Sequence, residues 1–259
     1  MLSTAVSPRP WFPIRHDSRR TRADATMITR LSTAPRASGM SLEEFQAHWR
    51  SEHADVVSRL PGLRRYTQNH AVLEHGIPVL LGPGLDACAE LDFDDHQAME
   101  TAFHSEFHQT AISRDQTTLI ERSGLAVMIG RRERCIGNVP SRASLKLMIF
   151  IGCRDAPFDA EGVLATVGSV AAAAADVDVR IANETEYIVN IGTDGGTSVL
   201  PFCQMVWIGW CSSAAVAREV WRRIVDRLPA AGVTTGHAVR PLLATPVQVV
   251  PGGPDATNV

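Results

Sequence analysis

Hydrophobic residues between positions 41 and 60 recur at the spacing of an amphipathic helix: Phe45, Trp49, Val56, Val57 and Leu60. Ser41 precedes this run, and Glu44 lies three positions after Ser41, which is the pattern of a capping box. The sequence therefore predicts a helix over residues 41–60 whose first turn is well marked.

Shorter runs on either side of this helix have the length and composition of strands. In the first half they cover residues 28–34, 63–73, 86–93 and 125–130, with a second helix beginning near Asp94. In the second half we expect strands at 145–153, 179–191 and 204–211 and a last one ending at Val250, with helices near 159–175 and 212–228. Both halves thus follow the order βαββαβ.

A βαββαβ unit forms a four-stranded antiparallel sheet with both helices on one face, so its other face needs a cover. We predict an α+β protein of two fused ferredoxin-like domains whose sheets pack as an intramolecular dimeric α/β barrel. The expected ranges are a disordered extension at 1–26, domains at 27–137 and 144–251, and a tail at 252–259. A full-length homodimer through another surface stays open.

Composition narrows the class of protein. The chain has 259 residues, 45% of them hydrophobic, and a formal net charge of -3, which gives no electrostatic footprint for nucleic acid or an anionic membrane. No apolar run approaches the ~20 residues of a membrane span. The five cysteines are scattered without a CxxC motif, which fits reduced thiols, and we expect a cytoplasmic protein. Residues 1–26 lack apolar periodicity, and Met27 is an alternative start.

Polar residues interrupt the apolar stripe of the predicted helix. His48, Glu52 and His53 fall within or beside it, where polar groups need partners or a function. In a regular α-helix about 140° separates residues five apart, so His48 and His53 are expected to make separate contacts. Trp49 is most simply a core residue.

The strand LRRYTQNHAVL alternates polar side chains between its two faces. Tyr66, Gln68 and His70 share one face, while Asn69 lies on the other with Arg65 and Thr67. If Tyr66 and His70 point toward the helices, they could meet His53 in an acid/base cluster. If they point to the barrel seam, they are interface polar groups. The pattern leaves both arrangements open.

Two further candidates lie in the second predicted helix. His104 and His108 have the i, i+4 spacing of a metal-binding pair, but HxxxH without a third ligand is usually a solvated helix face, so no metal site is expected. Asp115 could pair with an arginine or orient a histidine through its carboxylate.

The blocks GMSLEEFQAHWRSEHADVV and LPGLRRYTQNHAV resemble the EthD family of the dimeric α/β-barrel superfamily, and AELDFDDHQAMETAF and ISRDQTTLI extend the resemblance over about residues 27–130. The second half lacks these blocks and is interpreted as a divergent repeat. The resemblance implies a barrel shared with cofactor-free cyclases, dehydratases, lactone isomerases and monooxygenases of polyketide and aromatic metabolism. Fold by itself does not fix the reaction.

Local motifs for nucleotide hydrolysis, Rossmann cofactors, serine hydrolysis and zincin proteolysis are absent from the sequence. We therefore expect a cofactor-independent lyase, isomerase or cyclase acting on a small apolar or aromatic substrate. The expected catalytic residues are His53, Tyr66 and His70, and the expected substrate contacts are His48, Trp49, Asn69, Phe93, Phe103 and Asp115. The alternatives are an accessory ligand-binding protein of an oxidative pathway and a cofactor-free monooxygenase.

Overall fold

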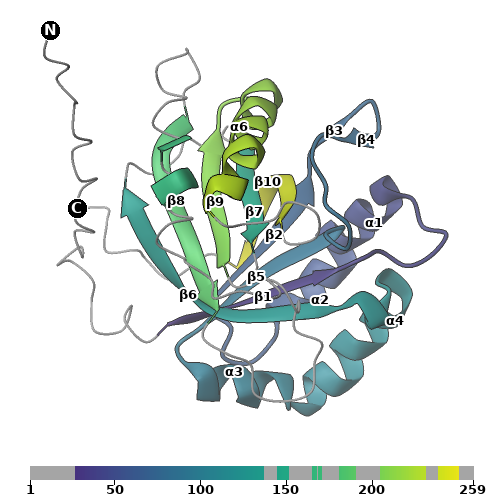
Figure 1. The fold of residues 1–259 in the computed structure, drawn as a ribbon. Helices are drawn as coiled ribbons and strands as arrows, with labels where there is room; N and C mark the ends of the chain where they lie inside the picture. Colours follow the sequence, from purple (N-terminus) through teal and green to yellow (C-terminus); the bar gives the residue numbers. More distant parts are fainter. Residues whose placement is uncertain are drawn as a thin grey trace, which may run out of the picture.

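The computed structural model describes residues 27–136, 145–151, 165–167, 169–170, 181–190, 205–231 and 239–250. It is a mixed α+β fold in which eight antiparallel strands close into a barrel, in the order β1-β5-β2-β10-β7-β9-β8-β6. In Figure 1 the strands curve around a common centre with helices on the outside. The predicted extension at 1–26, the break at 137–144 and the tail at 252–259 lie outside the described residues.

Four barrel strands come from each half of the chain. The first half supplies β1 (Ile28–Ala34), β2 (Arg65–Ala71), β5 (Ala87–Phe93) and β6 (Ala126–Ile136). The second half supplies β7 (Leu145–Ile151), β8 (Ile181–Asn190), β9 (Met205–Cys211) and β10 (Val239–Val250). The two sets join edge to edge through the antiparallel pairs β2 with β10 and β6 with β8. A small separate sheet pairs β3 (Leu73–Glu74) with β4 (Ile77–Pro78).

Two helical segments cover the outer face of the first-half strands (Figure 1). The first consists of α1 (Leu42–His48), the π-helical turn η1 (Trp49–His53) and α2 (Ala54–Ser58). The second consists of α3 (His96–Phe103), the π-helical turn η2 (His108–Ile112) and α4 (Ser113–Leu119), which the short 3-10 turn η3 (Arg122–Gly124) follows. Over the second half lie α6 (Ala214–Arg227) and the 3-10 turn η5 (Leu228–Ala231).

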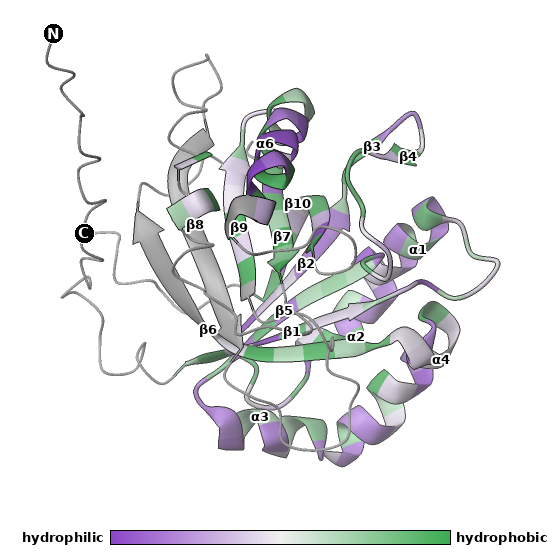
Figure 2. Cartoon of the chain, viewed as in Figure 1, coloured by the Kyte–Doolittle hydropathy of each residue, from purple (hydrophilic) through white to green (hydrophobic). Residues whose placement is uncertain are grey.

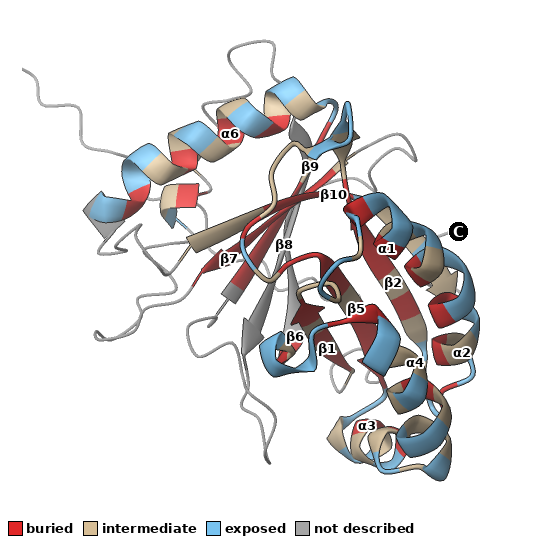
Figure 3. Ribbon diagram, turned by 90° about the vertical axis from the view of Figure 1, so that its right-hand side faces the viewer, coloured by how far each residue is buried: buried red, intermediate tan, exposed pale blue. Residues whose placement is uncertain are grey.

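Short polar side chains set where these helices begin. The predicted capping box forms: the Ser41 hydroxyl accepts from the Glu44 backbone, and the Glu44 carboxylate accepts from the Ser41 backbone. Asp95 caps α3 and Ser213 caps α6 in the same way at their first turns. Helix faces toward the sheet are buried and the opposite faces exposed (Figure 3), and the same division of hydrophobic and hydrophilic residues is visible along α6 in Figure 2.

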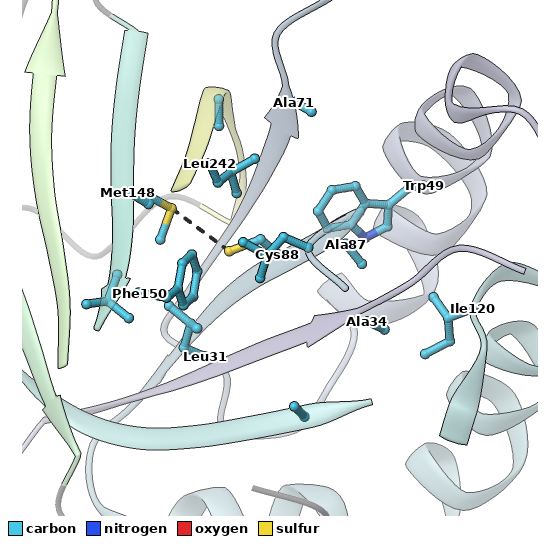
Figure 4. Packing of buried hydrophobic residues seen from close by; sticks show 14 of the residues in the cluster. Leu31, Ala34, Trp49, Ala71, Ala87, Cys88, Ile120, Met148, Phe150 and Leu242 are labelled. Carbon is cyan, nitrogen blue, oxygen red and sulfur yellow. Dashed lines mark hydrogen bonds between the residues drawn. The ribbon is translucent and has the colours of Figure 1, made fainter. Parts of the chain in front are cut away.

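Apolar side chains fill much of the barrel interior. Leu31, Cys88, Met148 and Phe150 are buried together there, as Figure 4 shows. The Cys88 thiol lies 3.9 Å from the Met148 sulfur. Because β5 and β7 are separated in the barrel by β2 and β10, this contact crosses the interior and not a strand boundary.

A polar group shares the barrel interior with these residues. Lys146, the only lysine in the chain, is buried and forms an ion pair with the buried carboxylate of Glu90. The Asn69 amide also donates to Glu90 over 2.7 Å. Lys146 belongs to β7 and Glu90 to β5, so the ion pair joins the two halves of the chain across the barrel.

Outside the barrel, one cluster of buried residues lies between the strands and helices of each half. The first-half cluster contains Tyr66, Leu91, Phe93, Met99 and Ile112. The second-half cluster packs Val220 and Ile224 of α6 against Leu147 and Trp207. Among the helices that the structure describes, none is long and apolar enough to cross a membrane.

Candidate functional site

Two histidines of the first helical segment contact one carboxylate from the second segment. Asp115 Oδ2 lies 2.5 Å from His53 Nδ1, and Asp115 Oδ1 lies 2.9 Å from His48 Nε2. His53 is 7% exposed, so this contact lies inside the layer between sheet and helices. The expectation of separate contacts for His48 and His53 is wrong, whereas Asp115 takes the histidine-orienting arrangement.

The π-helical turn explains this difference. A π-helix forms i to i+5 hydrogen bonds, which places residues five apart on the same side of the helix. His48 directly precedes the turn Trp49–His53, and His53 is its last residue. Both rings therefore reach Asp115, although a regular α-helix would separate them. The helical period of 3.6 residues applies to α1 and α2 on either side of the turn, but not to the turn itself.

The two rings differ in which nitrogen atoms are engaged. His48 contacts Asp115 with Nε2, and its Nδ1 lies 3.2 Å from Glu52. His53 contacts Asp115 through Nδ1 alone, so its Nε2 has no hydrogen-bond partner among the described residues. Since a carboxylate accepts, His53 Nδ1 donates, and a neutral His53 carries its lone pair on Nε2.

Asp115 has an electrostatic environment that suits this role. The hydrogen bond from His53 holds the pKa of Asp115 below its usual range, partial burial opposes that effect, and the bond from His48 adds to it. An ionised Asp115 fixes the orientation of the His53 ring and favours a positive charge on it.

Strand β2 lies beneath the π-helical turn and presents a polar chain to it. Gln68 Nε2 donates to the backbone oxygen of Trp49 over 2.6 Å and to the Tyr66 hydroxyl over 2.9 Å. His70 Nε2 lies 2.9 Å from Gln68 Oε1, and the His70 ring packs on Trp49 with centroids 4.7 Å apart. Tyr66, Gln68 and His70 therefore face the helices, which decides between the two arrangements open at the sequence level.

Burial sets the charge state of two of these groups. Burial raises the pKa of Tyr66, so its hydroxyl stays protonated at neutral pH. Burial lowers the pKa of His70 to about 4, with the Arg50 cation adding to the effect. His70 Nδ1 is buried without a hydrogen-bond partner within the described part of the chain. An unprotonated Nδ1 at that point is an unused acceptor.

Asn69 is not part of this group. Its side chain enters the barrel, where the amide nitrogen donates to Cys88 O over 3.1 Å and to Glu90. Alternation along β2 sends Asn69 to the face opposite Tyr66, so the structure does not bring this expected substrate contact together with His53 and Tyr66.

Phe93 and Phe103 lie beyond Tyr66 in the first-half cluster, with ring centroids 6.0 Å apart. Trp49 is 1% exposed and packs against Phe45 as a core residue. His104 Nδ1 lies 2.8 Å from the backbone oxygen of Glu100, which turns this histidine toward its own helix. Within the described residues no group of three or more His, Cys, Asp or Glu side chains is placed to hold a metal ion.

Comparison with known proteins identifies the first half of the chain. The EthD domain matches residues 37–123, a range that contains His48, His53, Tyr66, His70 and Asp115. The first half carries an EthD domain. No curated protein matches the chain significantly.

Solved structures similar to this chain have low sequence identity to it. An EthD family protein from Bacillus halodurans C-125 is 20% identical, over 40% of this chain and 97% of that chain, with a TM-score of 0.32. A proposed monooxygenase from Lactobacillus acidophilus NCFM is 13% identical over 86% and 94% of the two chains, with a TM-score of 0.45. A proposed monooxygenase from Fusobacterium nucleatum is 6% identical over 90% and 99%, with a TM-score of 0.50, a likeness of fold alone.

Sequence reasoning missed the roles of two polar residues, Gln68 and Arg30, on the helix-covered face of the first-half sheet. Gln68 was recognised on the face of Tyr66 and His70 but not as the group that joins them to the helix. Arg30 lies on β1, partly buried beneath Phe103. The alternation of ITRLSTA does indicate it, because Arg30 shares a strand face with Ile28, a hydrophobic residue of the core.

Proposed function

We propose that the chain is an acid–base enzyme that needs no cofactor and acts on a small apolar or aromatic substrate in the layer between the first-half sheet and its helices. The observation that carries this proposal is the hydrogen bond between His53 Nδ1 and Asp115, which leaves Nε2 without a partner among the described residues. A histidine oriented by a carboxylate is an effective general base, since the carboxylate also stabilises the imidazolium that forms.

In the proposed reaction, His53 Nε2 removes a proton from a carbon next to a carbonyl group of the substrate. The electron pair of the broken C–H bond moves to the substrate oxygen. The Tyr66 hydroxyl, whose oxygen already accepts from Gln68, donates its own hydrogen to the oxygen that gains charge. His53 then returns the proton to another atom of the substrate, which completes an isomerase, lyase or cyclase reaction.

We further propose that each half of the chain is one βαββαβ domain, the second a divergent repeat of the first. Strand order supports this: β6-β1-β5-β2 and β10-β7-β9-β8 both place the first and third strands of their half at the centre. The domain limits 27–137 and 144–251, the homologous origin of the second half and a cytoplasmic location belong to this proposal.

The substitution His53→Gln tests the enzymatic role. Glutamine keeps a polar side chain but cannot exchange a proton near neutral pH, so turnover should fall about 10²- to 10⁴-fold with little change in substrate affinity. Native mass spectrometry of the purified full chain would identify bound metabolites, and a panel of enol lactones, phenols and diketones would supply substrates. His96→Gln, a histidine at the start of α3, is the matched control.

An accessory ligand-binding protein is the second candidate, and the burial of Tyr66 and His70, at most 1% exposed, favours it. In that protein the polar chain of β2 only shapes a binding site. Metabolite binding that survives His53→Gln, without turnover in the unsubstituted protein, would support this alternative. Oxygen consumption during turnover would instead indicate a cofactor-free monooxygenase.

A further inference from the structure

Arg30 occupies the same helix-covered sheet face as the proposed acid–base group. In the strand register, Arg30 of β1 stands opposite Leu91 of β5, and Leu91 stands opposite Tyr66 of β2. Residues directly opposite in antiparallel strands share a face. Arg30 and Tyr66 therefore flank Leu91 in one transverse row, about 10 Å apart across two strand spacings.

The Arg30 guanidinium has no acidic partner among the described residues. Its Cζ lies 4.0 Å from the centre of the Phe103 ring, and Nη1 donates to the Ser32 hydroxyl. Burial lowers the pKa of Arg30 to about 10, which leaves the group charged at neutral pH. A guanidinium partly removed from water without a counter-charge destabilises the fold, and the cation–π contact with Phe103 offsets only part of that effect.

The surroundings of Arg30 add positive charge and an unused polar atom. The His108 ring contacts Phe103 with centroids 4.7 Å apart, and His108 Nδ1 is buried without a partner in the described ranges. Burial, followed by the Arg30 cation, lowers the pKa of His108, and Arg122 acts in the same direction. The charged groups that shift the pKa of His108 are Arg30, Arg122 and His104, and none of them is acidic.

The sheet between the two polar groups is partly accessible. Ser32 and Ala89 face each other on neighbouring strands, two residues along from Arg30 and Leu91 and therefore on the same face. Both retain intermediate exposure although helices cover this side of the sheet. Ala89 packs against both the cluster that includes the barrel interior and the first-half cluster. Solvent therefore reaches the sheet face between Arg30 and Gln68.

We propose that Arg30 binds a carboxylate of the substrate, so that the substrate is an aromatic or alicyclic carboxylic acid whose acid group lies about 10 Å from its reacting end. Two parallel N–H donors of a guanidinium match the two oxygens of a carboxylate, and the acidic partner that the described part of the chain does not supply would come from the substrate. Leu91 and Ala89 would contact the apolar ring between the two ends. This inference rests on the proposed function for the location of the reacting end at His53.

Binding of simple aromatic acids to the full chain tests the inference without a known substrate. The probes are benzoate and 2-naphthoate, each compared with its neutral amide by calorimetry. We expect at least one acid to bind more tightly than its amide. Arg30→Met should weaken binding of that acid about 10- to 100-fold and leave the amide unchanged, as expected for loss of a charged hydrogen bond. Arg30→Lys should retain part of the preference, and Arg59→Met, at an exposed arginine, should retain all of it.

Thermal unfolding separates a binding role from a structural one. If Arg30 serves to bind an anion, the Arg30→Met variant should melt at the same or a higher temperature than the unsubstituted protein when no ligand is present. The acid should raise the melting temperature of the unsubstituted protein only. A lower melting temperature together with an unchanged preference for acid over amide would overturn the inference. So would the lack of any acid preference in the unsubstituted protein.

The two proposals fail in different ways. His53→Gln should leave the affinity for the acid probes intact, because the probes need only Arg30. If His53→Gln abolishes turnover while Arg30→Met binds the acids normally, the carboxylate inference is wrong and the proposed function stands. If Arg30→Met no longer binds the acids while His53→Gln keeps full turnover, Arg30 does bind a carboxylate and the proposed catalytic role of His53 is wrong.

Discussion

His70 is a residue whose surroundings keep it neutral. Its Nε2 is engaged by Gln68, its ring packs on Trp49, and burial lowers its pKa to about 4. Between pH 6.5 and 4 the unfolded chain therefore binds a proton at this position that the native protein does not. The stability that neutral His70 contributes is complete above pH 6.5 and is lost as the pH falls through 4.

We expect the free energy of unfolding to fall by up to about 3 kcal/mol between pH 7 and pH 4 because of His70. His70→Gln, which does not titrate, should show a shallower decline, while His96→Gln should follow the unsubstituted protein. Urea unfolding at closely spaced pH values would measure this. Asp115, whose pKa is lowered, adds its own loss of stability only from about pH 5 downward, where the unfolded carboxyl begins to bind a proton, and this part of the decline should be common to both proteins. Equal slopes for the His70 variant and the unsubstituted protein would contradict the prediction.

At the scale of one element, the π-helical turn depends on a strand that is distant in sequence. Gln68 donates to the Trp49 carbonyl at the start of the turn, and the same side chain accepts from His70 and donates to Tyr66. The turn is thus supported by a residue of β2, and the support disappears if that residue loses its amide.

Gln68→Leu should destabilise the protein by about 1–3 kcal/mol, because buried polar groups on both the helix and the strand lose their partner. The separation of His48 and His53 from Asp115 should also increase, which NMR of the imidazole protons would detect. Gln97→Leu, at an exposed glutamine of α3, is the control and should change stability little. Unchanged imidazole resonances in Gln68→Leu would show that the turn holds its shape without the amide.

At the scale of the whole molecule, the barrel is closed by contacts between the two halves. Among the described residues, two ion pairs join them: Lys146 with Glu90 inside the barrel, and Arg218 of α6 with Glu74 of β3 at the surface. Their burial differs sharply, since the first pair is at most 3% exposed and the second is nearly half exposed. Breaking the buried ion pair should therefore reduce stability far more than breaking the exposed one.

Lys146→Met should cost about 3–5 kcal/mol, because it removes the Lys146 cation from its ion pair with a buried carboxylate. Adding Glu90→Leu should recover a large part of that loss, and a double-mutant cycle from urea unfolding would measure the coupling. Arg218→Met removes the exposed pair and should cost at most about 1 kcal/mol. A loss for Lys146→Met as small as that for Arg218→Met would contradict the role of the interior pair.

The first half expressed alone, residues 27–137, should dimerise or aggregate. Without the second half, β2 and β6 become open sheet edges, and interior residues such as Leu31 and Cys88 lose their cover. Light scattering would distinguish the outcomes. A soluble, stable monomer would show that the first-half sheet does not need the second half.

Periodicity alone predicted most elements of the described fold, because capping and alternation are local properties. Strand 28–34 and the capped start of the first helix follow the predicted limits, and the alternation in LRRYTQNHAVL correctly separates Asn69 from Tyr66 and His70. The candidate residues His53, Tyr66 and Asp115 were also visible in the sequence: His53 as a polar group beside the apolar stripe of a helix, Tyr66 by strand alternation, and Asp115 as a carboxylate that could orient a histidine.

Only the tertiary structure decided how these residues meet. Strand alternation allows either face of β2 to point toward the helices. In the folded protein the face with Tyr66 and His70 packs against the π-helical turn. The turn itself shifts the helical phase by one residue, and its support comes from Gln68, which no local pattern near Trp49 reveals. The contacts of Asp115 with two histidines more than 60 residues away, and of Arg30 with Phe103, arise from long-range packing for the same reason.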